Sequence, residues 1–409
     1  MTDPVTAASP GAMRWLILFA VWLLYAAFGL VVTSLAPLIG PIEASLDISH
    51  AQMGSVLGAW QGVYIVSAIP CGILLDRLGS RWALVIAAAV IAASAFGRSL
   101  ADSYGMLLMA VMIFGLGGPI VSAGAPKVIA QWFSGSDRGF AMGVYLTGPS
   151  VGGVISLMLT HSVLLPAFGN DWRQVLMLWG AVAIVAGMVW LAVASTPTAL
   201  AGEKAERAVA RAPQGQTMRR LLRAPAVRLV MAMSVGVFMF NHGLNNWLPE
   251  MLHAEGMTPV QAGFWSAIPT IVGIAGSLTI PRLATPGRRF TILLLLSVAA
   301  CAATLLLHFQ ARPVLLTGLV MQGIARSALM TVLILTLVEL PAIGAQHAGT
   351  AAGLFFSAAE VGGVLGPLMM GSLYQLTGAF DAALWLLTAV TALLAIATVW
   401  LRRAAQAPG

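Results

Sequence analysis

The stretch Gly72-Ile-Leu-Leu-Asp76-Arg77-Leu-Gly79-Ser-Arg81 joins two long apolar segments of this 409-residue chain. One acid, two arginines and two glycines fall within ten residues, while residues 48–75 and 82–97 on its two sides contain only the uncharged side chains of an apolar run. Glycine permits a sharp reversal of the chain, and short charged loops between apolar helices are typical of membrane proteins. The stretch therefore predicts a tight turn between two membrane-spanning helices.

The composition of the whole chain supports this interpretation. Hydrophobic residues make up 59% of the chain, charged residues make up 9%, and the mean hydropathy is +0.91. Soluble domains carry about 25% charged residues, and no single soluble core hides so much apolar surface. The composition excludes most soluble enzymes, nucleic-acid binders and disordered chains. It predicts an all-α membrane protein that crosses the bilayer many times.

Twelve segments are long and apolar enough to cross a bilayer, which takes about 20 residues per helix. Two of them carry a central charge, Arg326 in the tenth and Glu360 in the eleventh. The predicted spans lie at residues 15–42, 48–75, 82–97, 103–126, 139–170, 174–202, 229–249, 256–281, 290–311, 313–340, 347–374 and 382–401.

The distribution of Lys and Arg between the loops predicts the orientation of the chain. With the N-terminus inside, the cytoplasmic loops hold sixteen of these residues, and the opposite loops hold Arg98, Arg173 and Arg312. Cytoplasmic loops of membrane proteins are enriched in Lys and Arg. We therefore expect a bacterial-type plasma (inner) membrane protein with an uncleaved first span and both termini in the cytoplasm. The basic pI of about 10.1 then reflects topology and attraction to anionic lipid, without a nucleic-acid partner.

The chain divides into two related halves. One long polar segment, 196–226, predicts a cytoplasmic linker between an N-terminal six-helix bundle, 1–195, and a C-terminal one, 227–409. Residues 139–154 and 349–364, which lie 210 positions apart, are identical at seven of sixteen positions. Pseudo-symmetric halves around a midplane site are the layout of a transporter that rocks between two openings.

A second repeat lies before the second and eighth spans. Ser49-His-Ala-Gln-Met-Gly54 parallels Thr258-Pro-Val-Gln-Ala-Gly263. Ser and Thr are preferred helix N-caps, and glycine lets a neighbouring helix approach closely. Each segment predicts a capped helix start followed by a contact between helices.

The loop from Gly72 to Arg81 resembles the GxLxDRxGxR loop motif of the major facilitator superfamily, with every key position present. Trp132-Phe133-Ser-Gly-Ser-Asp137-Arg138-Gly139 resembles the family's WF…RG loop, and Gly148-Pro149-Ser-Val-Gly152-Gly153 resembles the GPxxGG part of its fifth-helix motif. The resemblance implies twelve helices in two pseudo-symmetric six-helix bundles and transport by alternating access. It also implies that Asp76, Arg77 and Arg81 act at a cytoplasmic gate.

The same comparison bears on packing and on substrate. Gly148, Pro149, Gly152 and Gly153, with the repeat-related Gly362 and Gly363, are expected to pack or kink helices. Val111 stands where many family members, drug and proton antiporters especially, carry an arginine. The glycine-rich fifth and eleventh spans and the buried cation loosely resemble the nitrate/nitrite, cyanate and oxalate or monocarboxylate branches of the superfamily.

Arg326 is the first candidate for substrate binding, because a charge within a span is costly and defaults to a functional role. A guanidinium near the bilayer centre binds a carboxylate or a similar anion through two hydrogen bonds. The alternative is a structural ion pair with Glu360. Glu360, in turn, is a candidate for the coupling proton, with permanent pairing or polar packing as its alternatives.

The seventh span is the most polar. Asn241 and Asn245, four residues apart, share a helix face and are candidates for hydrogen bonds to substrate. His242 is a candidate for both substrate binding and proton coupling, or for hydrogen-bonded packing. Gly243 and Pro249 predict a discontinuous helix here, as in other carriers.

The remaining candidates are secondary. Lys127 is expected to extend to the cytoplasmic interface, with a second substrate cation as the alternative, and Glu339 is expected near the gate. Aromatic residues within spans pack more often than they bind. Five residues of the N-terminal half are expected to line the cavity if they do bind: Tyr25, Trp60, Gln61, Tyr64 and Tyr145.

Two functional hypotheses remain. The first is a secondary-active carrier of a small organic or inorganic anion, driven by proton symport or anion exchange. The second is a proton-coupled exporter of drugs or amphipathic metabolites. The sequence has no nucleotide-binding loop or paired catalytic carboxylates, so an enzyme is not expected. Cys71 and Cys301 lie in apolar runs and give no metal-ligand spacing, so we expect no cofactor or metal. We also expect the protein to be a monomer.

Overall fold

The computed structural model describes residues 10–200, 224–285, 287–338 and 348–406, and the described part of the chain contains no β-strand. The first half comprises α1 (Pro10–Thr33), η1 (Ala36–Leu38), α2 (Ile39–Leu46), α3 (His50–Ser99), α4 (Tyr104–Trp132), α5 (Gly135–Leu159), η2 (Thr160–Leu164), α6 (Leu165–Ala167) and α7 (Trp172–Ala194). The second half comprises α10 (Pro225–Ala254), α11 (Pro259–Leu283), α12 (Arg289–Leu306), α13 (Arg312–Val338), α14 (Ala348–Thr377) and α15 (Asp381–Gln406).

The number of spans agrees with the prediction. Within the described residues, 11 helices are long and apolar enough to cross a membrane, and one of them, α3, has 50 residues. Gly79 interrupts α3 with φ 79° and ψ 165°, a conformation that glycine adopts without strain. Because the chain reverses at Gly79, α3 has two arms and contributes two spans, which makes twelve in all. The predicted tight turn is confirmed.

The first span is shorter than predicted. Residues 15–42 do not form one helix, because α1 ends at Thr33 and the chain continues through η1 into α2. Pro37 and Pro41 lie in these two short elements, and proline removes a backbone donor and disfavours a continuous helix. The chain therefore turns before it re-enters the bundle at Ser49.

Arg98 lies in a different environment from the one predicted. The sequence predicts a loop position for Arg98, yet it lies in the last turn of α3 and is only 1% exposed. Its Nη1 donates to the Val31 carbonyl at 2.8 Å and to Ser34 Oγ at 3.3 Å, and its guanidinium lies 5.3 Å from the Phe114 ring centroid. The break after α1 exposes carbonyls that a cation satisfies well, which explains why this arginine is buried.

Glycines set the closest helix pairs within each half. A Cβ placed on Gly152 of α5 would collide with the Ala26 carbonyl oxygen of α1. A Cβ on the repeat-related Gly362 of α14 would collide in the same way with the Val235 carbonyl oxygen of α10. Gly148 also faces α1, where its Cβ would lie 3.0 Å from the Trp22 carbonyl oxygen. Small residues thus bring the first and fifth helices of each half into backbone contact.

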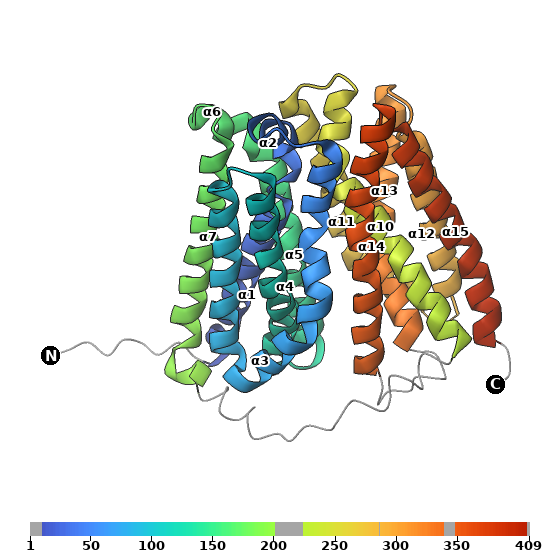
Figure 1. Cartoon of the computed structure of the whole chain (residues 1–409). Coiled ribbons are helices and arrows are strands. Elements are labelled where there is room, and N and C mark those ends of the chain that lie inside the picture. The colour runs from blue at the N-terminus through green and yellow to red at the C-terminus, as the bar shows by residue number, and fades with distance from the viewer. Residues whose placement is uncertain (1–9, 201–223, 286, 339–347, 407–409) are drawn as a thin grey trace.

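Glycines also join the two halves, at the end of the bundle that carries α2 and α6, which lies uppermost in Figure 1 and which we call the far end. On α3, a Cβ at Gly54 would lie 2.6 Å from the Pro367 carbonyl oxygen, and one at Gly58 would lie 2.8 Å from that of Val364. On α11, the Gly263 Cβ would collide with the Leu157 carbonyl oxygen.

Both helices that carry these glycines start with the predicted caps. Ser49 and Gln52 form a capping box before Gly54, and Thr258 and Gln261 form one before Gly263. The capping boxes fix where each helix starts, and therefore where its glycine meets the other half.

The contact between α3 and α14 ends before the opposite end of the bundle, where α1 begins and α15 ends and which we call the terminal end (Figure 1). On the α3 face that packs against α14, Ile69 is 72% exposed and a Cβ on Gly72 would meet no atom within 4 Å. Gly353 on the facing side of α14 is equally open. Between α5 and α11, contact reaches further, since a Gly143 Cβ would lie 3.2 Å from Leu278 Cδ2. The halves are therefore joined at the far end and separated between α3 and α14 at the terminal end.

We predict that Gly362→Ala lowers the free energy of unfolding by about 1–3 kcal/mol, because the added methyl overpacks a backbone contact. Gly353→Ala, on the same helix, is the matched control and should leave stability almost unchanged. Thermal unfolding of purified protein in detergent measures both variants. Equal melting temperatures for the two would contradict the proposed role of the contact.

Candidate functional site

Arg326 lies in the middle of α13, half-buried, and it is anchored from α11. Its Nη1 donates to Thr270 Oγ1 at 2.9 Å. No carboxylate in the described part of the chain forms an ion pair with it. A guanidinium has five donors, so this arginine retains most of its capacity to bind an anion.

His242 of α10 and Gln61 of α3 connect the two halves beside Arg326. Gln61 Nε2 donates to His242 Nδ1 at 3.2 Å, and the charge of Arg326 lies close enough to act on the His242 ring. Gln61 is fully buried, whereas His242 is half-buried. This hydrogen bond brings a side chain from each half into the same polar site.

Glu360 of α14 lies beside Gln61. It is 5% exposed, and a Cβ on Gly363 would lie 2.9 Å from its Oε2 and 3.0 Å from Gln61 Cγ. The predicted alternative of a structural pair with Arg326 is wrong for this conformation, because the two form no ion pair among the described residues. Arg326 of α13 bonds Thr270 of α11 instead, whereas Glu360 of α14 lies beside Gln61 of α3.

Three buried acceptor oxygens on the helices that form this site have no hydrogen-bond partner among the described residues. They are Gln61 Oε1, Asn241 Oδ1 and Glu360 Oε2. Buried polar atoms usually have partners, so these oxygens favour donors supplied by a bound solute or by water. Together with Arg326, they combine one cationic anchor with several acceptors.

Aromatic rings surround the polar residues. The His242 ring lies 5.9 Å from that of Trp60 and 5.3 Å from that of Phe238. Trp60 in turn contacts Tyr64 at 6.2 Å between centroids. Such rings give a solute apolar contact area while the few polar groups orient it.

Tyr25 and Tyr145 lie further into the first half. Their rings stack 5.6 Å apart, and Tyr25 lies 5.5 Å from Phe28, which contacts Trp60. The five aromatic and amide residues predicted for this half therefore form one continuous cluster. Within the described residues, Tyr145 stacks on Tyr25 and forms no hydrogen bond with Arg326 or Glu360.

The seventh span differs from its prediction. The helix α10 is continuous from Pro225 to Ala254, so the expected break at Gly243 and Pro249 is wrong. Gly243 instead permits close packing, because its Cβ would lie 3.0 Å from Met370 Sδ of α14. Asn246 Nδ2 donates to the His242 carbonyl at 2.8 Å. Asn245 is half-buried one turn after Asn241.

The candidate gate residues lie at the terminal end, apart from this site. Asp76 and Arg77 are exposed, and Lys127 Nζ lies 3.3 Å from Asp76 Oδ1. The Arg81 carbonyl accepts a hydrogen bond from Trp190 Nε1 at 3.0 Å. Lys127 therefore belongs with the loop motif rather than with Arg326. Glu339 lies outside the described residues.

Two residues that touch the site were not predicted, Thr270 and Phe238. Thr270 is an isolated hydroxyl in the apolar run Ile268-Pro-Thr-Ile-Val272, and Phe238 precedes His242 by one helical turn. A polar residue within a span is a signal that a search for charges alone overlooks. The one-turn spacing of Phe238 is a second signal, since residues four apart share a face.

Comparison with known proteins identifies the family. The sequence profile of the Major Facilitator Superfamily matches residues 21–359, which is most of the chain. The chain belongs to the major facilitator superfamily. Members of this superfamily that resemble the chain are transporters, so it is a multi-pass membrane solute carrier and not an enzyme.

Its relatives in sequence include carriers of sugar acids. It is 28% identical over 304 residues to the D-galactonate transporter of Escherichia coli O6:H1, with 68% of each chain covered. It is 24% identical over 423 residues to a probable galactarate/D-glucarate transporter of Bacillus subtilis, covering 92% of this chain and 89% of the relative. It is also 24% identical over 383 residues to a probable sulfoacetate transporter of Cupriavidus necator, covering 88% and 87%.

Solved structures with the same fold include two further transporters. The nucleoside transporter NupG superposes with a TM-score of 0.76 at 14% identity, covering 96% of this chain and 99% of that one. A bacterial homologue of the human lysosomal transporter Spinster superposes with a TM-score of 0.74 at 18% identity, covering 98% of both. At these identities the likeness shows that this chain and the two transporters share a fold.

We predict that water reaches the contact between α3 and α14 only from the terminal end. In a Cys71→Ser, Cys301→Ser background, Gly353→Cys should react rapidly with a membrane-impermeant maleimide, because open space surrounds that position. Ala359→Cys is the matched control on the same helix and should stay unlabelled, because Ala359 is 0% exposed. Similar labelling rates at both positions would contradict the one-sided opening.

Proposed function

We propose that this carrier moves a small hydroxylated organic monoanion, of the sugar-acid kind, by alternating access. Arg326 carries the proposal, because it is a half-buried cation that no carboxylate among the described residues neutralises. A guanidinium binds a carboxylate through two charge-assisted hydrogen bonds. The unpartnered oxygens of Gln61 and Asn241 accept hydrogen bonds from the solute's hydroxyl groups.

The sequence relatives support an anionic substrate rather than a drug. The names of the three sequence relatives given above specify galactonate, galactarate or glucarate, and sulfoacetate, all of which are acids. A drug exporter requires an apolar site of broad selectivity, whereas this site centres on a single cation. We therefore favour the anion carrier over the exporter.

We propose proton symport as the coupling mode, with Glu360 as the proton carrier. Glu360 is 5% exposed and has no cation partner among the described residues, so burying it in charged form costs several kcal/mol. Binding of an anion at Arg326 together with a proton at Glu360 adds no net charge to the membrane interior. This balance favours movement of the loaded carrier.

We further propose that the terminal end faces the cytoplasm of a bacterial cell and that the protein is a monomer. The sixteen Lys and Arg residues of the loops support this orientation through the positive-inside rule. Residues 1–195 and 227–409 then form the rocking domains, and 196–226, most of which falls outside the described residues, links them on the cytoplasmic side. The conformation described above is the inward-facing one, because α3 and α14 are separated at the terminal end around Ile69, Gly72 and Gly353.

Arg326→Ala should weaken binding of D-galactonate roughly tenfold to a hundredfold, because charge-assisted hydrogen bonds contribute about 1.5–3 kcal/mol. Arg312→Ala is the matched control, since Arg312 is an exposed arginine at the start of the same helix. Ligand-induced thermal stabilisation across a panel of aldonates, uronates and sulfonates measures the affinity. Unchanged affinity in Arg326→Ala would refute the assignment of this residue.

Glu360→Gln should retain substrate binding but lose uptake driven by an imposed pH gradient, because an amide carries no exchangeable charge. Counterflow of labelled substrate in proteoliposomes, which needs no net proton movement, should persist and is the internal control. A variant that still accumulates substrate in response to the pH gradient would rule out Glu360 as the proton carrier.

A further inference from the structure

His50 lies where the two halves meet at the far end. It is the first residue of α3, in the first half, yet its ring stacks between two rings of the second half. The centroid distances are 5.4 Å to Trp247 of α10 and 4.1 Å to Tyr374 of α14, with interplanar angles of 17° and 12°. A Cβ on Gly371 of α14 would collide with the His50 carbonyl oxygen, so the backbone is in contact here as well.

His50 also pairs with a carboxylate of its own half. Its Nδ1 lies 3.0 Å from Glu43 Oε2 of α2, and the two side chains are 19% and 10% exposed. Glu43 Oε1 and His50 Nε2 are buried without a hydrogen-bond partner among the described residues. The pair therefore has polar capacity that its own half does not satisfy.

Glu250 of α10 faces this pair from the second half. Its Oε2 would lie 3.8 Å from a Cβ on Gly40 of α2, and the charges of Glu43 and His50 both act on its carboxyl group. One carboxylate from each half thus flanks the histidine. Other titratable groups near this cluster include Tyr374 of α14, the exposed Asp47 before α3, His253 of α10, and His161 of η2.

A cavity of about 200 Å³ adjoins the cluster. Its lining includes Pro37 and Gly40 from the first half and Glu250 and Pro259 from the second. His161 Nε2 and His253 Nδ1 donate to the carbonyls of Pro37 and Met257, which leaves the other nitrogen of each ring for water. Glu250, His161 and His253 give this cavity polar groups, and a cavity of this size has room for several water molecules, through which protons reach the cluster.

We propose that His50, Glu43 and Glu250 form a proton-binding latch that holds the far end closed. When His50 is protonated, its imidazolium lies between two carboxylates and between two aromatic faces, all of which attract a cation. When it is neutral, the carboxylates of Glu43 and Glu250 repel each other across the boundary between the halves. Acid on this side therefore stabilises the closed far end, and alkali favours its opening.

This latch is separate from the proposed substrate and proton sites. It requires neither Arg326 nor Glu360, and it acts on the conformational equilibrium whatever the solute is. Histidine is the side chain that changes charge between about pH 5 and 8, so the latch responds to the acidity of the outer medium under the proposed orientation.

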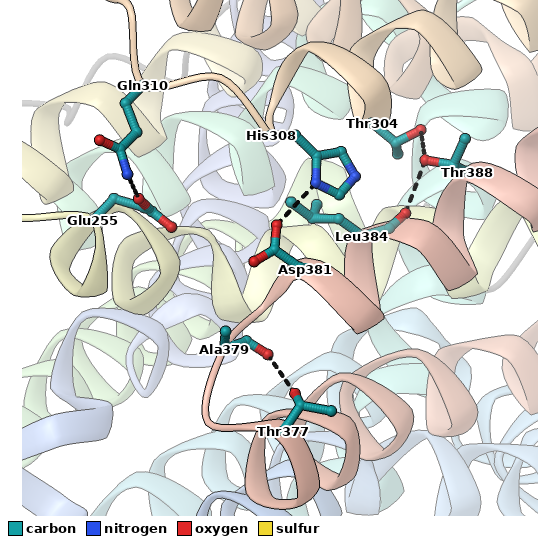
Figure 2. A network of polar contacts seen from close by, with 9 residues as sticks. All are labelled: Glu255, Thr304, His308, Gln310, Thr377, Ala379, Asp381, Leu384 and Thr388. Atoms are coloured by element: carbon teal, nitrogen blue, oxygen red, sulfur yellow. Dashed lines mark hydrogen bonds and ion pairs between the residues drawn. The ribbon is translucent and has the colours of Figure 1, made fainter.

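The second half contains a matched control (Figure 2). His308 Nδ1 lies 3.0 Å from Asp381 Oδ1, and its ring lies 4.7 Å from that of Trp385. The chemistry is that of the His50 cluster, a histidine with a carboxylate and an aromatic ring, at the same end of the bundle. Both partners belong to the second half, however, so this pair does not bridge the halves.

The test measures the separation of the halves directly. Spin labels are attached to Asp102→Cys and Leu376→Cys, which are exposed positions on different halves at the far end, in a Cys71→Ser, Cys301→Ser background. Electron–electron double resonance on protein in lipid nanodiscs then gives the fraction of molecules with the short distance. We expect the ratio of short-distance molecules to open molecules to rise at least about threefold as the pH falls from 8 to about 5.5.

In His50→Gln the short-distance fraction should no longer depend on pH, whereas His308→Gln should behave like the parent protein. Glu250→Gln removes the repulsion and should hold the far end closed at both pH values, which tests the latch even if His50→Gln does not fold. A pH response that persists in His50→Gln, or in Glu250→Gln, overturns the proposal. Loss of the response in His308→Gln overturns it as well.

Discussion

Backbone contact at glycine is the interaction on which this structure depends. Helices within a bilayer gain little from burying apolar side chains, because lipid is as apolar as the helix surface. Close packing must supply the association instead, and it is strongest where no side chain separates the backbones. Gly152 and Gly362 provide this contact within the halves, and Gly54 and Gly263 provide it between them.

The positions of these glycines along the helices determine where the carrier is closed. Gly54 and Gly58 lie in the first part of α3, close to its capped start, and the contact with α14 follows them. Further along α3, larger side chains such as Ile69 are exposed. A bundle joined at one end by short contacts and separated at the other can change shape by pivoting, because no continuous seam has to break.

Much of the fold could be predicted from the sequence because its signals are local. Apolar length gives the spans, a glycine within a charged motif gives the turn at Gly79, and the Ser49 and Thr258 repeats give the two capped starts. The break after Thr33 also has a local cause, since Pro37 and Pro41 are visible in the sequence, but the high hydropathy of 15–42 obscured it. Local patterns of this kind identify elements better than they identify contacts.

The candidate site was harder to predict because side-chain contacts depend on how each helix is rotated about its axis. The sequence places Arg326 and Glu360 at similar depths, yet they form no pair among the described residues, and Thr270 binds the arginine instead. The charge of Arg98 predicts a loop position for this residue, whereas the broken end of α1 offers it buried acceptors. Both outcomes depend on atoms brought together from distant parts of the chain.

The separation of Arg326 from Glu360 has a consequence for transport. If the two formed a permanent pair, an anion would have to displace the carboxylate, and the cost of doing so would oppose binding. Without that pair, the proposed anion site at Arg326 and the proposed proton site at Glu360 are independent groups within one polar cluster, joined through His242 and Gln61. Because Gln61 belongs to one half and His242 to the other, occupancy of either site changes the charge around a bond that crosses the boundary between the halves. Substrate and proton can therefore influence the same conformational change without touching each other.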